Sequence, residues 1–203
     1  MLNYYMSHPL YAVIIIVLLL LSLFVLFKAV KSGSERSRKV NELMEKMKKD
    51  NELLNKYAIL TEDVISESEP EELFHGVGLN LQKKVSDNPD MLSEFNSFND
   101  SRKYIYSLFT FFEDAGEGMS AFFSANTKPL THYAAEAVRL IFPDDVKEAF
   151  INEYDATDED NEQVSYDKEK MEEWDKKAAP SIEDGTLKKL CGEYIKSHPD
   201  CFI

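Results

Sequence analysis

An uninterrupted apolar run near the start of the chain limits what this sequence can fold into. Leu10 to Phe27 are eighteen residues without a single charge. At about 1.5 Å per residue, a helix of this length measures roughly 27 Å, which is close to the hydrocarbon thickness of a bilayer. The run therefore predicts one transmembrane helix, within a membrane anchor that covers residues 1–30.

The flanks of the run distinguish an anchor from a cleaved signal peptide and set its orientation. A signal peptide has basic residues before its apolar segment, whereas residues 1–9 contain no Lys or Arg. Basic residues follow the run instead, at Lys28, Lys31, Arg36, Arg38 and Lys39. Because positive flanks stay on the cytoplasmic side, we expect a single-pass protein of the cytoplasmic (inner) membrane, with the amino terminus outside and the remaining chain in the cytoplasm.

Residues 31–62 read as a basic linker followed by a charged stem helix. Apolar and small residues recur there at alternating spacings of four and three, interrupted by one Asn: Val40, Met44, Met47, Asn51, Leu54 and Ala58. This is the heptad pattern of a coiled coil, but it covers fewer than three heptads. The stem therefore has two interpretations, a homodimer through the stem helix or a helix that packs on its own domain, and the short length favours the second.

Residues 63–203 predict a compact helical domain. Helical periodicity alternates there with Pro, Asn, Asp and Gly, and strand-like alternation is almost absent. Pro70 suits the first turn of a helix, Asn99 or Asp100 caps an aromatic helix that ends near Gly116, and a final helix starts near Asp184. The fold class is accordingly all-α, with about six to eight helices in this domain. In the helix after Pro129, the expected buried stripe consists of Tyr133, Ala137, Leu140 and Ile141.

Charge is distributed unevenly along the chain. Of the 23 Lys and Arg nine precede residue 61, and of the 37 Asp and Glu only five do, which leaves 14 basic and 32 acidic side chains in residues 61–203. This net charge of −18 repels nucleic acid, so we expect no direct DNA or RNA binding and a basic protein as partner. The stem, at +2 over residues 34–60, is attracted to an anionic membrane surface.

The most concentrated acids lie in and around the run DATDEDNEQ, residues 155–163. The candidate interaction residues are Asp144, Asp145, Glu148, Asp155, Asp158, Glu159, Asp160 and Glu162. The run has three interpretations: a solvated connector, a calcium loop or an acidic docking surface. A calcium loop that starts at Asp158 would place Gln163 where the sharp turn requires glycine, so no metal ligand is assigned.

Motifs of catalysis are absent from the sequence. The four histidines are scattered, and no HExxH, GxSxG or GxxxxGK[ST] occurs. Two cysteines, Cys191 and Cys201, are too few for a disulfide framework. The sequence therefore predicts neither an enzyme nor a cofactor.

Three segments together resemble a known family. They are YIYSLFTFFEDAGEGMSAFFSAN (residues 104–126), HYAAEAVRLI (132–141) and LKKLCGEYIKSHPDCF (187–202). Their order and spacing are similar to a family of small bacterial helical domains, the DNA mimic proteins whose founding member carries the number nineteen. The resemblance covers about Glu71 to Phe202 and implies an all-α domain whose acidic surface imitates duplex DNA, without catalysis. In the Gly-rich turn Glu113, Gly118 and the Phe122-Phe123 pair match the family pattern, whereas its two Asn, one Gly and its Gln are missing.

Taken together, these features predict a membrane-anchored acidic protein-interaction module that imitates DNA to bind a basic DNA-binding protein or a toxin. The alternative is a structural, membrane-tethered helical domain in which the acidic residues serve solubility.

Overall fold

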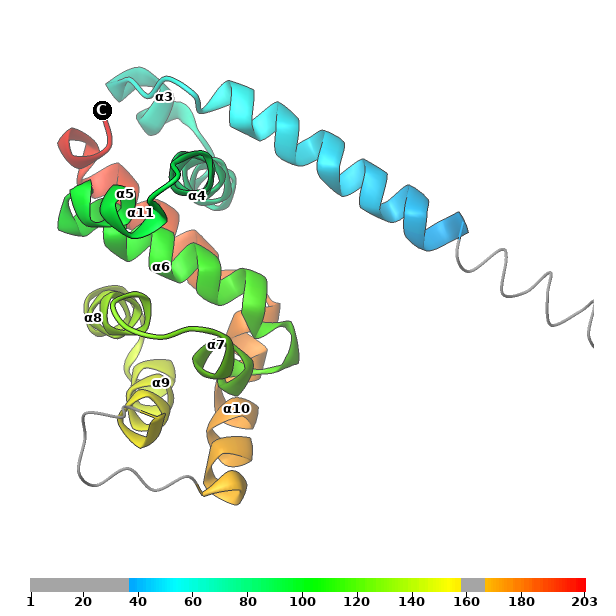
Figure 1. Cartoon of the computed structure of the whole chain (residues 1–203), viewed down its shortest axis with the longest axis vertical. Coiled ribbons are helices and arrows are strands. Elements are labelled where there is room, and N and C mark those ends of the chain that lie inside the picture. Colours follow the sequence, from blue (N-terminus) through cyan, green and yellow to red (C-terminus); the bar gives the residue numbers. More distant parts are fainter. Residues whose placement is uncertain (1–36, 158–166) are drawn as a thin grey trace, which may run out of the picture. The chain divides into compact units, whose positions relative to one another are not determined.

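The computed structural model describes residues 37–157 and 167–203. The chain divides into two units, Met1–Lys49 and Asp50–Ile203. All regular structure in the described residues is helical, which confirms the all-α prediction (Figure 1). The expected transmembrane helix at Leu10–Phe27 lies outside these residues, and none of the helices within them is long and apolar enough to cross a membrane.

The stem prediction corresponds to a helix over residues 37–56, drawn from blue to cyan in Figure 1. Residues 37–49, which belong to the first unit, are all exposed. In the second unit Leu53 and Tyr57 are buried, whereas Asn51 and Ala58 are exposed. The stem residues that enter the core are therefore not the ones that the heptad pattern singled out.

Polar contacts fix the beginning of the second unit to one helix, α4 (Pro70–Asp87). The Tyr57 hydroxyl donates a hydrogen bond of 2.8 Å to Glu72, and the Asn80 amide donates to the backbone carbonyl of Leu54 at 3.2 Å. His75 lies 2.9 Å from Asp50. Since Tyr57 is also almost completely buried, this segment is part of the second unit's core.

The other helices of the second unit follow in chain order. They are α3 (Glu62–Glu67), α5 (Met91–Ser97), α6 (Asp100–Asp114), α7 (Met119–Ala125), α8 (Leu130–Ile141), α9 (Asp144–Thr157), α10 (Lys168–Glu183) and α11 (Thr186–Ser197), with short 3₁₀ turns η1 (Ala115–Glu117) and η2 (Pro199–Cys201). Asn99 caps α6 by accepting from the Arg102 N–H at 2.9 Å, as predicted. Pro70 occupies the first turn of α4.

The larger helices of the second unit form a closed series of contacts around one core. α4 packs against both α6 and α11, α6 packs against α8, α8 against α9, α9 against α10, and α10 returns to α11. α7 contacts α6, α9 and α10 and so closes one end of the core (Figure 1). Every one of these helices buries one side, which explains why the sequence shows helical periodicity throughout.

Two helices differ from the sequence prediction. α8 buries Ala134, Ala135 and Val138, whereas Leu140 of the expected stripe is 64% exposed. The short alanine side chains let α8 pack closely on α6, so small residues and not the largest apolar ones define its buried side. α10 continues through Pro180 to Glu183, although a proline within a helical pattern normally predicts the end of a helix.

The core where α6, α7 and α9 meet is aromatic. Phe111 of α6 makes edge-to-face contacts with Phe122 of α7 and Phe150 of α9, with ring centroids 5.5 and 5.2 Å apart. All three side chains are fully buried. Contacts of this geometry add about 0.5–1.5 kcal/mol each to the burial of the rings. They fix the rotation of α9 about its axis and thereby decide which of its side chains face water.

Glycine allows the closest approach between helices. A Cβ at Gly192 of α11 would lie 1.8 Å from the backbone carbonyl oxygen of Pro70 in α4. Backbone atoms cannot move aside as a flexible side chain can, so α4 and α11 pack at this distance only with glycine. Gly116, by contrast, has no atom within 4 Å of the place that a Cβ would occupy.

We expect Gly192→Ala to destabilise the second unit by about 1–3 kcal/mol, because it overpacks a contact against rigid backbone. Urea unfolding of a fragment of residues 50–203, which hold this unit, measures the change. Gly116→Ala is the matched control and should shift stability by less than about 0.5 kcal/mol. Equal stability of the two variants would contradict the close packing of α4 on α11.

Candidate interaction surface

The acidic residues of α9 lie on its solvent side. Val146, Ala149 and Phe150 are buried and hold the helix against the core. Asp144 and Asp145 occupy the first turn, where the positive end of the helix dipole stabilises negative charge. The exposed acids of this helix, which we call the α9 acidic face, are Asp144, Asp145, Glu148 and Asp155.

Helix geometry brings these four side chains together. At about 100° per residue, Asp144, Glu148 and Asp155 fall within about 40° of one another, and Asp145 lies about 100° from Asp144. Eleven residues separate the first from the last, which corresponds to about 17 Å along the axis. The structure thus places four of the eight predicted site residues on the exposed side of α9. The other half, Asp158, Glu159, Asp160 and Glu162, lies outside the described residues.

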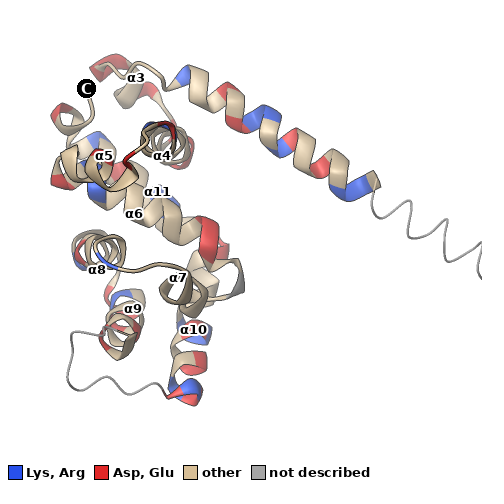
Figure 2. Cartoon of the chain, viewed as in Figure 1, with Lys and Arg blue, Asp and Glu red and all other residues tan. Residues whose placement is uncertain are grey.

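Two lysines partly neutralise the α9 acidic face. The Lys147 ammonium lies 2.9 Å from Asp144 and lowers the pKa of that carboxyl through a hydrogen bond and its charge. Lys177 of α10 lies 2.7 Å from Glu148. The paired carboxylates nevertheless stay open to water, since the Asp144 and Glu148 side chains are 99% and 66% exposed. Figure 2 shows the resulting mixture of red and blue on α9 and α10.

A second acidic surface was missed by the sequence analysis. Five exposed acids gather in α3 and at the start of α4: Glu62, Asp63, Glu67, Glu69 and Glu71. We call them the α3–α4 acidic segment; red residues mark α3 in Figure 2. None of the five forms a salt bridge within the described part of the chain. The signal was present in the sequence, because no Lys or Arg occurs between Lys56 and Lys83.

The Gly-rich turn before α7 is organised by one carboxylate. Asp175 of α10 accepts hydrogen bonds from the Met119 N–H and from the Ser120 N–H and hydroxyl. Gly118 has a φ of +109°, and a Cβ there would lie 2.7 Å from the Asp175 carboxylate. Glycine is therefore required at Gly118 both for its backbone conformation and for the approach of Asp175. This turn acts as a structural junction between α6, α7 and α10.

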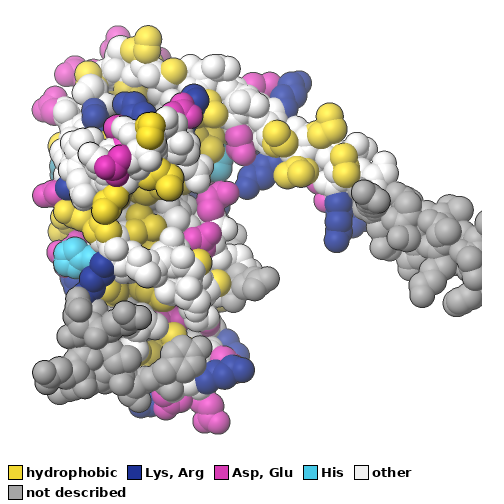
Figure 3. Space-filling model, viewed as in Figure 1, with side chains coloured by type: hydrophobic (Ala, Val, Ile, Leu, Met, Phe, Trp, Pro, Cys, Tyr) yellow, Lys and Arg dark blue, Asp and Glu magenta, His cyan; other side chains and the backbone are white. Residues whose placement is uncertain are grey.

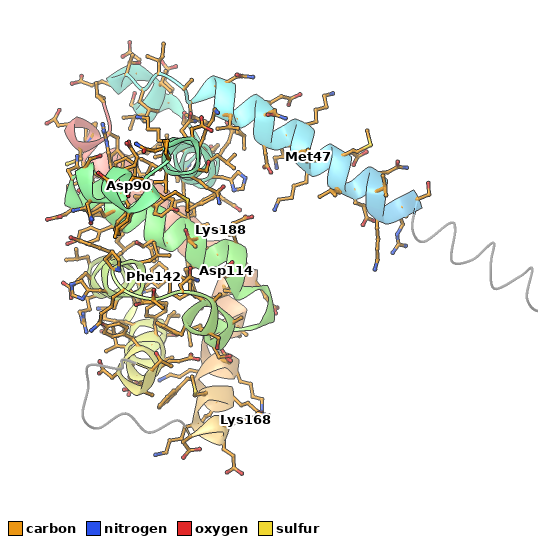
Figure 4. The ribbon with its side chains drawn as sticks, in the orientation of Figure 1. Met47, Asp90, Asp114, Phe142, Lys168 and Lys188 are labelled. Atoms are coloured by element: carbon orange, nitrogen blue, oxygen red, sulfur yellow. The ribbon has the colours of Figure 1, made fainter. Side chains whose placement is uncertain are left out.

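A small cavity of about 170 Å³ lies next to this turn. Its wall includes Phe112, Gly118, Asp175 and Lys188, and the Lys188 ammonium lies 5.5 Å from the centre of the Phe112 ring. Figure 4 labels Lys188 on α11 and Asp114 at the end of α6. Because Asp175 already accepts from backbone and hydroxyl donors, the cavity has little unsatisfied polar capacity for a ligand.

One acidic residue of α9 faces the core instead of the solvent. Glu153 is fully buried, and neither of its carboxyl oxygens has a hydrogen-bond partner within the described residues. Burial, and the negative charge of Asp175 on α10, raise the pKa of Glu153 to about 8. The group is therefore protonated and uncharged at neutral pH. Glu153 lies about 60° around the helix axis from Phe150, so both fall on the apolar side of α9, and a helical projection of the sequence would have identified it.

The described residues hold no evident centre for catalysis or metal binding. No group of three His, Cys, Asp or Glu side chains within them is arranged to hold a metal ion. His75 pairs with Asp50, and the His198 ring stacks on Tyr194 with centroids 4.3 Å apart. The calcium loop that would start at Asp158 has its residues 158–166 outside the described part of the chain.

Comparisons with family models, curated proteins and solved structures found no match to this chain.

We expect the stability of the second unit to fall as pH rises from about 4.5 to about 8, because only the folded state keeps a proton on Glu153 in this window. Below this window Glu153 is protonated in both the folded and the unfolded state, and above it the loss of stability is complete. At about 1.4 kcal/mol per pKa unit the loss amounts to a few kcal/mol. Urea unfolding of residues 50–203 at about pH 5, 7 and 9 measures it.

Glu153→Gln should remove this pH dependence, so its stability relative to the unsubstituted chain should increase towards pH 9. Asp145→Asn serves as control, because it removes one exposed carboxylate from the same helix. A Glu153→Gln variant that retains the full decline with pH would show that another group causes it.

Proposed function

We propose that this chain is a membrane-anchored acidic module that binds a basic protein through the α9 acidic face. The observation that carries the proposal is the placement of Asp144, Asp145, Glu148 and Asp155 on one exposed face of a helix whose rotation is fixed by the core. This face belongs to a domain with a net charge of −18. The α3–α4 acidic segment adds a second acidic surface in the same unit.

The charge spacing supports imitation of DNA. Four carboxylates over about 17 Å lie on average about 5.5 Å apart along the helix axis, the same order as the 3.4 Å between charges on each strand of duplex DNA. A DNA-binding protein or a toxin with a basic surface is the partner class that this spacing fits. The pairs with Lys147 and Lys177 do not prevent such binding, because exposed ion pairs contribute only about 0–1 kcal/mol and a partner's Lys or Arg can replace them.

In this proposal the module acts by binding and not by catalysis. The apolar run Leu10–Phe27 anchors the chain in the cytoplasmic membrane, with the amino terminus outside and the acidic domain in the cytoplasm. Anchoring would hold the basic partner at the membrane and away from nucleic acid.

The ion pairs favour one alternative, a structural membrane-tethered domain in which acidic residues serve solubility. Lys147 and Lys177 each pair with a carboxylate of the α9 acidic face, as expected for an ordinary solvated helix. Variants that lose the same charge at different positions separate the two functions, because a solubility role depends on total charge and not on its position.

The test compares two variants of residues 50–203 that lose the same charge. The first neutralises the α9 acidic face by Asp144→Asn, Asp145→Asn, Glu148→Gln and Asp155→Asn. The second neutralises four exposed acids elsewhere, by Glu169→Gln, Glu172→Gln, Glu173→Gln and Glu193→Gln. Each fragment is immobilised and exposed to a panel of purified basic DNA-binding proteins at low salt, with and without competing duplex DNA.

We expect at least one panel member to bind the unsubstituted fragment, to be displaced by duplex DNA, and to dissociate as ionic strength rises to about 0.3 M. The α9 variant should weaken this binding by about tenfold or more, equal to about 1.4 kcal/mol, and the control by less than about threefold. Equal loss in both variants, or binding that duplex DNA does not reduce, would refute imitation of DNA by this face.

A further inference from the structure

The first unit exposes a cluster of large apolar side chains. Val40, Leu43, Met44 and Met47 are 48%, 57%, 63% and 56% exposed, although they occupy one helix. We call these four residues the stem face. Figure 3 shows the yellow apolar side chains beside dark blue Lys and Arg on this helix, and Figure 4 labels Met47. Single exposed apolar residues are common, but four on adjacent turns indicate a surface that is covered in use.

Charge is arranged around the stem face in a definite order. At about 100° per residue, its four side chains span an arc of about 100°. Lys39 and Lys48 border the two edges of this arc, each about 40° away, and Lys46 lies about 60° from the edge that Lys39 borders. Both acids of the segment, Glu42 and Glu45, fall within about 30° of the opposite pole, where Arg38 and Lys49 also lie, and Arg38 pairs with Glu42 at 3.3 Å. All these residues are exposed.

We propose that residues 37–49 lie on the surface of a bilayer that contains anionic phospholipids, with the stem face turned into the lipid. An apolar arc bordered by lysines, with a charged face opposite, is the arrangement of an interfacial helix. Lysine side chains extend along the apolar region while their ammonium groups bind the anionic headgroups. This inference is independent of the proposed binding of a basic protein, which involves only the second unit.

The length of the stem face favours lipid over a second copy of the chain. The face covers residues 40–47, about 12 Å of helix, which is little more than one heptad. A stable coiled coil has an apolar seam over at least three to four heptads. Here the seam does not continue, because Asn51 and Ala58 are polar or small and Leu53 and Tyr57 are buried in the second unit.

The position of the segment in the chain also favours a membrane surface. Only nine residues separate the apolar run Leu10–Phe27 from residue 37, and they include Lys28, Lys31 and Arg36. Even when fully extended, they carry residue 37 no more than about 35 Å from the end of the run. If that run spans the bilayer, the lysines of the stem are held near the surface that attracts them.

Spin labels on the full chain test this orientation. In a Cys201→Ser background, with Cys191 fully buried, one variant carries a nitroxide at Met47→Cys and another at Glu45→Cys. Two residues apart, these positions point about 160° away from each other. Each variant is mixed with vesicles of phosphatidylcholine, alone or with about 30% phosphatidylglycerol, and collisions with a water-soluble nickel chelate are measured.

We expect the nitroxide at position 47 to become at least about threefold less accessible to nickel than that at position 45 on the anionic vesicles. Lys39→Gln, Lys46→Gln and Lys48→Gln together should abolish most of this protection. Lys168→Gln, Lys170→Gln and Lys189→Gln, which remove the same charge from the second unit, should leave it unchanged.

Three results would overturn the proposal. Equal accessibility at the two positions on anionic vesicles, including the case in which the chain does not associate with them, would show that the face is not on lipid. Dipolar broadening between labels at position 47 would show that a second copy covers it. Equal protection on neutral vesicles, or after removal of the three bordering lysines, would exclude a role for anionic headgroups.

Discussion

The contacts of Phe111 with Phe122 and Phe150 are the interaction on which the second unit most depends. They join α6, α7 and α9 at a point where none of the three rings reaches solvent. A helix that carries as many charges as α9 has a weak apolar side, so its rotation is not fixed by burial alone. The fixed ring geometry supplies what the amphipathic pattern lacks, and it directs Asp144, Glu148 and Asp155 to the solvent.

The same rotation buries Glu153, which opposes stability. An apolar residue of similar volume would fit the fully buried position without an unpaired carboxyl. Protonation limits the cost, because a neutral carboxyl is far less expensive to bury than a carboxylate. It also means that the domain carries one negative charge fewer at neutral pH than its composition implies. Charge near Asp175 and the Gly118 turn is thus held low, and the negative charge of the described residues is concentrated on outward-facing helix sides.

Helix positions were predictable because each depends on a local signal, whereas helix orientation depends on distant residues. Pro70 and Asn99 mark helix starts through their own backbone chemistry, whatever surrounds them. The buried side of α8 could not be read in this way, since Ala134 and Ala135 are buried through the proximity of α6 and not through their own hydrophobicity. Similarly, burial of Tyr57 requires its partner Glu72 and the glycine at Gly76.

The candidate interaction surface shows the same difference between what local sequence signals predict and what depends on the fold. The sequence itself indicates the acids of α9, whereas their exposure is shown by the structure. The α3–α4 acidic segment is a weaker sequence signal, because its five acids from Glu62 to Glu71 are spread among serines and apolar residues. Only the fold shows that α3 and the start of α4 expose all five together.

The opposite charges of the two units give the two proposals a common physical basis. An anionic membrane surface attracts the lysine-bordered stem and repels a domain of net charge −18. Both forces decay over about 8 Å at physiological ionic strength, so the repulsion acts only on acids that come close to the headgroups. Binding of the stem to lipid therefore does not occupy the acidic faces.

A basic protein has the opposite preference, because it is attracted by α9 and by the α3–α4 acidic segment but repelled by the stem. Lipid and protein would then select different parts of the same chain by charge alone.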